Sequence, residues 1–323
     1  MFSAETYKQR RAELARRIGN GLILISGNTL SPFNYPNNTY SFRQDSTFLY
    51  YFGLNIPSLM AVIDAESGEA MLFGDDFTVE DIIWTGPQPC LVELGAQVGV
   101  SNCQPLKALD GVLATAMKLN RRIHFLPPYR GESKIELSRL LGLPIAELYP
   151  HKSVDLMFAV AEMREVKSAE EIEALERAFQ LGYAMHTTAM KMCKAGVVER
   201  EIAGAMEGIA KSQGLGVSFP SIVSQHGETL HNLNSDGVLE NGRLLLVDGG
   251  NRCRVGRGDA LWRRLYRRGY HLDRPTTLPC RAWRTSWSIK LPAIASARRR
   301  DCCCYEAEPP YSLPPTISRR GQD

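Results

Sequence analysis

The chain changes character just after residues 244–250, Leu-Leu-Leu-Val-Asp-Gly-Gly, and this change limits what it can fold into. Residues 1–251 carry 22 Lys and Arg against 29 Asp and Glu, a net charge of −7, whereas residues 252–323 carry 16 against 6, a net charge of +10. The second stretch also holds 15 arginines but one lysine, and 5 of the 8 cysteines. Such asymmetry indicates that the two parts do not share one fold. We expect residues 1–251 to fold and residues 252–323 to form a largely disordered basic tail.

Residues 1–155 alternate between helical and strand patterns, which predicts a mixed α/β domain. Short apolar runs bounded by Gly, Ser or Asn are typical of buried strands, and apolar residues three or four apart are typical of amphipathic helices. The expected elements are helix 4–18, strand 22–25, strands 59–63 and 70–73, helix 105–119, strand 123–126 and helix 133–141.

Residues 156–251 are expected to begin a second domain, which makes the division 1–155, 156–251 and 252–323. Ser168, followed three residues later by Glu171, predicts a capping box at the start of a long amphipathic helix. A second helix is expected near 199–213, followed by strands at 219–223 and 243–247.

Composition excludes some classes of protein. No stretch approaches the roughly 20 apolar residues of a membrane span, and the first 17 residues have no apolar signal core. Single, scattered cysteines in the body of the chain are typical of a reducing compartment. We therefore expect a soluble cytoplasmic protein without a membrane partner.

Asp248 and His231 are the residues that could carry chemistry. Asp248 ends an apolar run and precedes two glycines, so it is either a turn-opening aspartate or a carboxylate that binds a cation. His231 lies 17 residues earlier and, taken alone, is compatible with an ordinary loop or core histidine. On segments able to converge, the two together favour a metal-dependent hydrolase with a histidine beside the metal.

Three groups of residues resemble the Xaa-Pro aminopeptidases, the aminopeptidase P family. Residues 42–53, which run Phe-Arg-Gln-Asp-Ser-Thr-Phe and include Tyr50 and Gly53, are similar to the N-terminal domain of that family. Residues 162–172 resemble the first helix of its pita-bread catalytic domain, and 219–250 match the central strands in order and spacing. The resemblance implies an aminopeptidase P-type (creatinase-type) N-terminal domain, then a partial pita-bread domain. We expect the chain to be a C-terminally incomplete, truncated member.

The resemblance also implies a reaction and a cofactor. Members release the N-terminal residue from peptides with proline at the second position, using two Mn²⁺ per site and a bridging hydroxide. Asp248 stands where the family has its first aspartate ligand, and His231 where it has a histidine that contacts substrate. Asp259 has the spacing of the second aspartate, but it lacks the surrounding strand pattern and threonines.

The remaining ligands of the family have no acceptable equivalents here. His271 lacks a Pro-Gly-rich ligand loop, and Glu306 and Glu308 lie in a proline-rich segment without strand character. We therefore expect this chain to be an inactive metallopeptidase. The alternative is a catalytically dead module that binds peptides or proteins. Prolidase and creatinase are related possibilities, which the Arg-Gln-Asp-Ser segment at 43–46 disfavours. The family often associates through its N-terminal domain, so a homo-oligomer is also expected.

The origin of residues 252–323 has three possible explanations. Paired arginines with interleaved Trp and Tyr would suit a nucleic-acid-binding arm, but the near absence of lysine and the run Cys302-Cys303-Cys304 do not. A divergent domain is the second possibility. We favour a departure from the ancestral reading frame near Asn251, because Arg, Cys, Trp and Pro rise together as in a GC-rich gene read out of frame. The coding DNA tests this, since another frame should encode a Thr-Arg-Thr-like segment.

Overall fold

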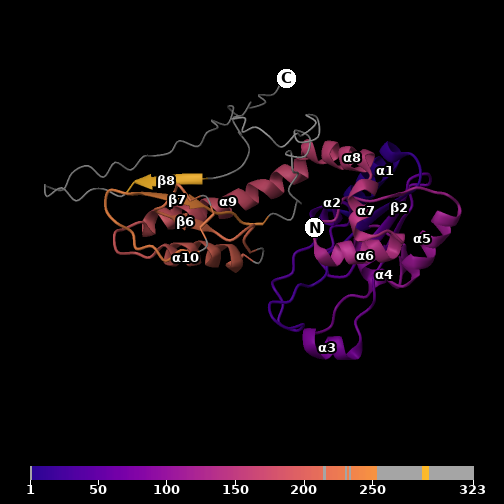
Figure 1. The fold of residues 1–323 in the computed structure, drawn as a ribbon, viewed down its shortest axis with the longest axis horizontal. Helices are drawn as coiled ribbons and strands as arrows, with labels where there is room; N and C mark the ends of the chain where they lie inside the picture. The colour runs from indigo at the N-terminus through magenta and orange to yellow at the C-terminus, as the bar shows by residue number, and fades with distance from the viewer. Residues whose placement is uncertain (1, 214–215, 230, 233, 253–285, 291–323) are drawn as a thin grey trace, which may run out of the picture.

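The computed structural model describes residues 2–213, 216–229, 231–232, 234–252 and 286–290. These residues form two lobes, and the long helix α9 runs between them (Figure 1). The first lobe is the mixed α/β domain that the sequence predicts, and the second begins the partial catalytic domain.

The first lobe is built on a five-stranded sheet with the strand order β4-β3-β2-β1-β5. Its strands are β1 (Leu22–Ser26), β2 (Met60–Asp64), β3 (Ala70–Phe73), β4 (Asn102–Gln104) and β5 (Ile123–His124). The three central strands pair antiparallel, whereas β4 and β5 add in parallel at the two edges. The strands expected at 22–25, 59–63, 70–73 and 123–126 are therefore present, whereas β4 was not predicted.

Helices cover both faces of this sheet, which is why its central strands are apolar at nearly every position. The helices are α1 (Ala4–Ile18), α2 (Ser46–Phe52), α3 (Val79–Thr85), α4 (Leu91–Gln97), α5 (Ala108–Lys118), α6 (Gly131–Leu141), α7 (Ile145–His151) and α8 (Val154–Glu165). One core joins Ile23 and Ile63 of the sheet to α1, α2, α4 and α8. The other joins Leu24 and Val62 to α5, α6 and α7. Successive strand residues thus enter opposite cores.

Helix α8 begins at Val154 and so spans residue 155, where we expected the first domain to end. Its residues Leu156, Ala159 and Val160 are buried in the core that α1 and α2 share. The helix therefore packs on the first lobe while its C-terminal end leads toward the second. The domain boundaries stay a prediction.

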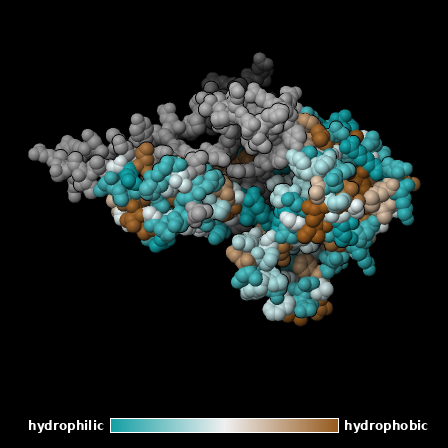
Figure 2. Space-filling view, in the orientation of Figure 1, coloured by the Kyte–Doolittle hydropathy of each residue, from teal (hydrophilic) through white to brown (hydrophobic). Residues whose placement is uncertain are grey.

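Helix α3 is an exposed apolar tip at the lower end of the first lobe, where Figure 2 shows brown side chains. Val79 and Ile83 are each 76 % exposed and Trp84 is 81 % exposed. The helix buries none of its own residues, and a capping box between Thr78 and Asp81 closes its N-terminus. Local hydrogen bonds rather than core packing therefore stabilise it.

The second lobe places two helices against a three-stranded antiparallel sheet of order β6-β7-β8. Its elements are α9 (Ala169–Met192), α10 (Glu199–Ser212), β6 (Ile222–Ser224), β7 (Leu244–Asp248) and β8 (Ser286–Lys290). The core between them includes Met185, Ile202, Val223 and Val247. The capping box expected at α9 is present: Glu171 N donates to Ser168 Oγ at 3.3 Å, and Ser168 N donates to Glu171 Oε2 at 2.9 Å.

Strand β7 has a neighbouring strand on each side. It pairs on one side with β6 and on the other with β8 along all five of its residues, from Leu244–Lys290 to Asp248–Ser286. Strand β8 lies within the stretch that we expected to be disordered, and the rest of residues 253–323 lies outside the described residues. Strand β8 supplies partners for backbone groups that an edge strand would leave open.

Within the described part of the chain, no helix is long and apolar enough to cross a membrane. Cys90, Cys103 and Cys193 carry free thiols.

His124 at the end of β5 is a buried histidine with a partner on each ring nitrogen. Its ring is buried; Nε2 donates to the carbonyl of Asn20 at 3.1 Å and Nδ1 lies 2.7 Å from Ser153 Oγ. Because a carbonyl only accepts, Nε2 carries the proton and Nδ1 accepts from the Ser153 hydroxyl. Burial is the main cause that lowers the pKa of His124. The neutral ring is thus the form that the fold favours.

We expect the contribution of His124 to stability to be present above the pKa of an unfolded histidine, about 6.5, and to be lost as pH falls through its lowered folded value. Urea midpoints between pH 7.5 and 5 should therefore fall more steeply for the wild type than for His124→Gln. His151→Gln, an exposed site, serves as the control with wild-type steepness. Equal slopes for all three proteins would refute this role.

Candidate functional site

Asp248 lies at the C-terminal end of β7 and is half-buried. Ladder partners flank it on both sides, Ile222 of β6 and Ser286 of β8. The strand that carries it is anchored by Leu245 and Val247, both fully buried in the core of the second lobe. The apolar run of the sequence thus fixes the position of this carboxylate.

Two glycines after Asp248 let the chain pass close to neighbouring side chains. A Cβ on Gly249 would lie 2.7 Å from the end of the Met206 side chain, and a Cβ on Gly250 would lie 2.8 Å from Ser218 Oγ. Both contacts are closer than carbon atoms tolerate without a shift of the neighbour. The backbone at Gly249 and Gly250 therefore lies close to Met206 of α10 and to Ser218 of the loop before β6.

His186 on α9 belongs to this site, and our sequence analysis missed it. Its Nε2 donates to the carbonyl of Gly249 at 3.2 Å. Burial lowers the pKa of His186, and the Gly249 carbonyl and the Asp248 carboxylate act in the opposite direction. The signal in the sequence is a histidine on the buried stripe of a helix, one residue from Met185 and three from Ala189, both fully buried.

His231 is an exposed residue in the loop between β6 and β7. No hydrogen bond or ion pair between described residues joins it to Asp248. The convergence of the two residues stays a prediction.

The described residues do not fit a metal centre on their own. Among them, no group of three or more His, Cys, Asp or Glu side chains could hold an ion together. Asp259, the weak candidate for the second ligand, lies outside the described residues, as do His271, Glu306 and Glu308. Of the candidate ligands, Asp248 is the one that lies within this part of the chain, and its role as a ligand stays a prediction.

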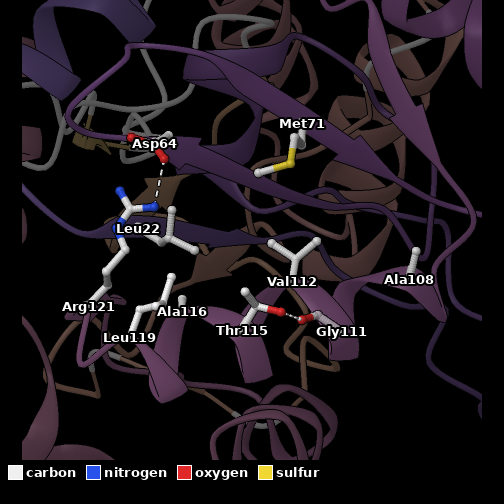
Figure 3. A pocket seen from close by; sticks show the side chains of 10 residues that line it. All are labelled: Leu22, Asp64, Met71, Ala108, Gly111, Val112, Thr115, Ala116, Leu119 and Arg121. Carbon is white, nitrogen blue, oxygen red and sulfur yellow. Dashed lines mark hydrogen bonds and ion pairs between the residues drawn. The ribbon is translucent and has the colours of Figure 1, made fainter.

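A hollow of about 510 Å³ in the first lobe is a separate feature. It is lined by residues of β1, β2, β3 and α5 and by Leu119 and Arg121, and Figure 3 shows Arg121 directed at Asp64. Their ion pair spans 2.8 Å and holds the pKa of Asp64 at about 2. None of the predicted site residues lines this hollow.

The two lobes meet near the start of the second lobe's sheet. Arg43 Nη1 of the first lobe donates to the carbonyl of Ser218 at 2.7 Å. In return, Arg252 Nη1 donates to the carbonyl of Phe42 at 3.1 Å. The Arg-Gln-Asp-Ser segment at 43–46 thus contacts the loop before β6 through Arg43, and Phe42, just before that segment, contacts the chain that follows Asp248.

Comparisons with known proteins agree with the resemblance. Residues 7–124 match the family model of the aminopeptidase P N-terminal domain, and residues 173–261 match that of metallopeptidase family M24. The Xaa-Pro aminopeptidase of Escherichia coli is 26 % identical over 271 residues, which are 80 % of this chain and 61 % of that protein. A probable Xaa-Pro aminopeptidase of Chaetomium globosum is 24 % identical over 75 % of this chain and 40 % of its own length. The chain thus spans 40 to 61 % of these relatives.

Solved structures show the same fold. The low-pH form of aminopeptidase P from E. coli superposes with a TM-score of 0.66 at 23 % identity, over 79 % of this chain and 60 % of that one. Proline aminopeptidase P II from Yersinia pestis gives the same score over 78 % and 61 %. With both family models, the relatives and the fold in agreement, the chain belongs to the aminopeptidase P family of M24 metallopeptidases.

Proposed function

We propose that the chain has the scaffold of an Xaa-Pro aminopeptidase but does not itself hydrolyse peptides with proline at the second position. One observation carries the proposal: the sequence around the only candidates for the later ligands, Asp259, His271, Glu306 and Glu308, lacks the ligand pattern of the family. The relatives' names support the substrate class, since they are Xaa-Pro aminopeptidases.

The family reaction, as we expect it, depends on two Mn²⁺ ions. Such a pair lowers the pKa of bound water and so supplies a hydroxide at neutral pH. Hard oxygen ligands suit Mn²⁺, and Asp248 is one such ligand. A single carboxylate holds a divalent ion weakly, because neither its charge nor its geometry completes a coordination shell.

A second candidate is a peptide- or protein-binding module without catalysis. The two arginines at the joint between the lobes favour it, because their guanidinium groups can bind a carboxylate. Association through the first lobe also remains a proposal, supported by the exposed apolar side chains of α3. We further propose a cytoplasmic location.

Metal content and turnover test the proposal. The full chain, purified with Mn²⁺ present and then desalted, is expected to retain no stoichiometric manganese by elemental analysis. Hydrolysis of an Xaa-Pro tripeptide is expected to match that of an Asp248→Asn variant. Two manganese ions per chain, with turnover that Asp248→Asn abolishes, would show instead that the chain is an active enzyme.

A further inference from the structure

Two arginines from different lobes are held close together by backbone carbonyls. Arg43 is anchored on Ser218 of the second lobe at 2.7 Å. Arg252 is anchored on Phe42 of the first lobe at 3.1 Å and, through Nε, on Val217 at 3.0 Å. Phe42 and Arg43 are consecutive, as are Val217 and Ser218. The hydrogen bonds of the two arginines therefore connect the same two short segments, one from each lobe. Both guanidinium groups are thereby tied to the joint, Arg43 by one hydrogen bond and Arg252 by two.

The two positive charges at this joint lack a compensating anion in the described part of the chain. None of the ion pairs between described residues includes Arg43 or Arg252. Arg252 is half-buried, and burial together with the charge of Arg43 lowers its pKa. Like charges at close range in a partly desolvated place repel each other unless an anion lies between them.

The guanidinium N–H groups of Arg43 and Arg252 that make none of these bonds can donate to an oxyanion. A guanidinium has five N–H donors, and the bonds described above use one on Arg43 and two on Arg252. Ser218, which accepts the bond from Arg43, also has a buried hydroxyl oxygen that has no hydrogen-bond partner among the described residues. Arg43 is exposed, so an anion can reach it from solvent.

We propose that the joint between the lobes is an oxyanion site, in which Arg43 and Arg252 together bind a carboxylate or a phosphate. Planar guanidinium groups recognise both through paired N–H···O bonds. Arg252 lies four residues beyond Asp248, so at most about 14 Å of extended chain separates them. The C-terminal carboxylate of a short peptide and free inorganic phosphate are the two sources of this chemistry.

Anion-dependent stabilisation of the full chain tests the site. Thermal unfolding is followed at constant ionic strength with rising inorganic phosphate, with a short peptide that ends in a free carboxylate, and with the same peptide as its C-terminal amide. We expect a saturable rise of the midpoint with phosphate, with the free-acid peptide, or with both, and none with the amide. Response to only one of the two anions identifies the source.

Variants assign the effect to the two arginines. Arg43→Gln and Arg252→Gln are each expected to weaken the apparent affinity at least tenfold, while Arg43→Lys retains part of it because the charge remains. Arg122→Gln, which removes an exposed arginine of the first lobe, should leave the affinity unchanged. Broadening of the phosphorus NMR signal of phosphate reports binding directly if a variant unfolds too early for the thermal assay.

The outcomes are distinct from those of the hydrolysis test. No saturable effect of either anion on the wild type, or equal affinity in the wild type and both Gln variants, overturns the oxyanion site. Neither result depends on manganese or on turnover.

Discussion

Replacing Glu171 with alanine is expected to lower the free energy of unfolding by about 3–5 kcal/mol. Glu171 Oε1 lies 3.4 Å from Arg10 Nη2, and the two side chains are only 3 % and 8 % exposed. That Arg10 nitrogen has no hydrogen bond, so the contact is an attraction between charges without hydrogen-bond geometry. Removing the carboxylate would leave a buried guanidinium without its counter-charge, which is the costly case.

Arg10 would retain other contacts in the Glu171→Ala variant. Its Nη1 donates to the carbonyl of Tyr50 at 3.0 Å, and its guanidinium lies 4.1 Å from the centre of the Tyr50 ring. These contacts do not neutralise its charge, although the ring face attracts a cation. The decrease in the free energy of unfolding should therefore stay large. The contact that is weakened is the one between α1, which carries Arg10, and the start of α9, which carries Glu171.

The matched control is Glu173→Ala, on the same helix. Glu173 forms an ion pair with Arg177, and both side chains are at least 66 % exposed. Exposed pairs contribute little, so this variant should unfold close to the wild type. Urea unfolding followed by circular dichroism measures all three proteins. Similar midpoints for Glu171→Ala and Glu173→Ala would show that the buried pair does not stabilise the fold.

Replacing Gly53 with alanine is expected to cost about 2–5 kcal/mol, the sum of backbone strain and overpacking. Gly53 ends α2 with φ of 66°, a left-handed conformation that suits glycine. A Cβ there would also lie 2.2 Å from the Tyr7 ring. Tyr7 is itself buried in the first core, so the ring has little room to move away.

Gly142→Ala separates the two costs. Gly142 also ends a helix, α6, with φ of 63°, but a Cβ there meets nothing within 4 Å. It should therefore show only the backbone cost of about 1–2 kcal/mol. The difference between the two urea midpoints measures the clash with Tyr7. If Gly53→Ala were no less stable than Gly142→Ala, the close approach of Tyr7 would not be the reason why position 53 requires glycine.

Several parts of the fold could be predicted from the sequence because they depend on neighbouring residues. The capping box of Ser168 and Glu171 involves residues three apart, and it starts α9 where expected. The apolar run before Asp248 predicts β7 within one residue of its observed bounds. The segment at 42–53 identifies the family, but its helix α2 was not predicted, although Phe48, Tyr51 and Phe52 have the i, i+3, i+4 spacing of a buried helical face.

The candidate site was harder to predict. His186 is 63 residues from Gly249, whose carbonyl it contacts, and no local pattern indicates that pairing. Strand β8 comes from a stretch whose composition predicted disorder, yet it pairs with β7. Pairing of distant strands depends on backbone groups, which composition does not describe.

The sequence by itself determined the long helices and the central strands, the family and the position of Asp248 at the end of a strand, because periodicity, capping and turn chemistry act between residues close in the chain. Only the tertiary structure decided that Arg10 meets Glu171, and that Arg43 meets Ser218 and Arg252 meets Phe42 across the joint. Arg252 and Phe42 are 210 residues apart. Such contacts depend on how whole helices and sheets pack, and many distant partners satisfy the same local pattern.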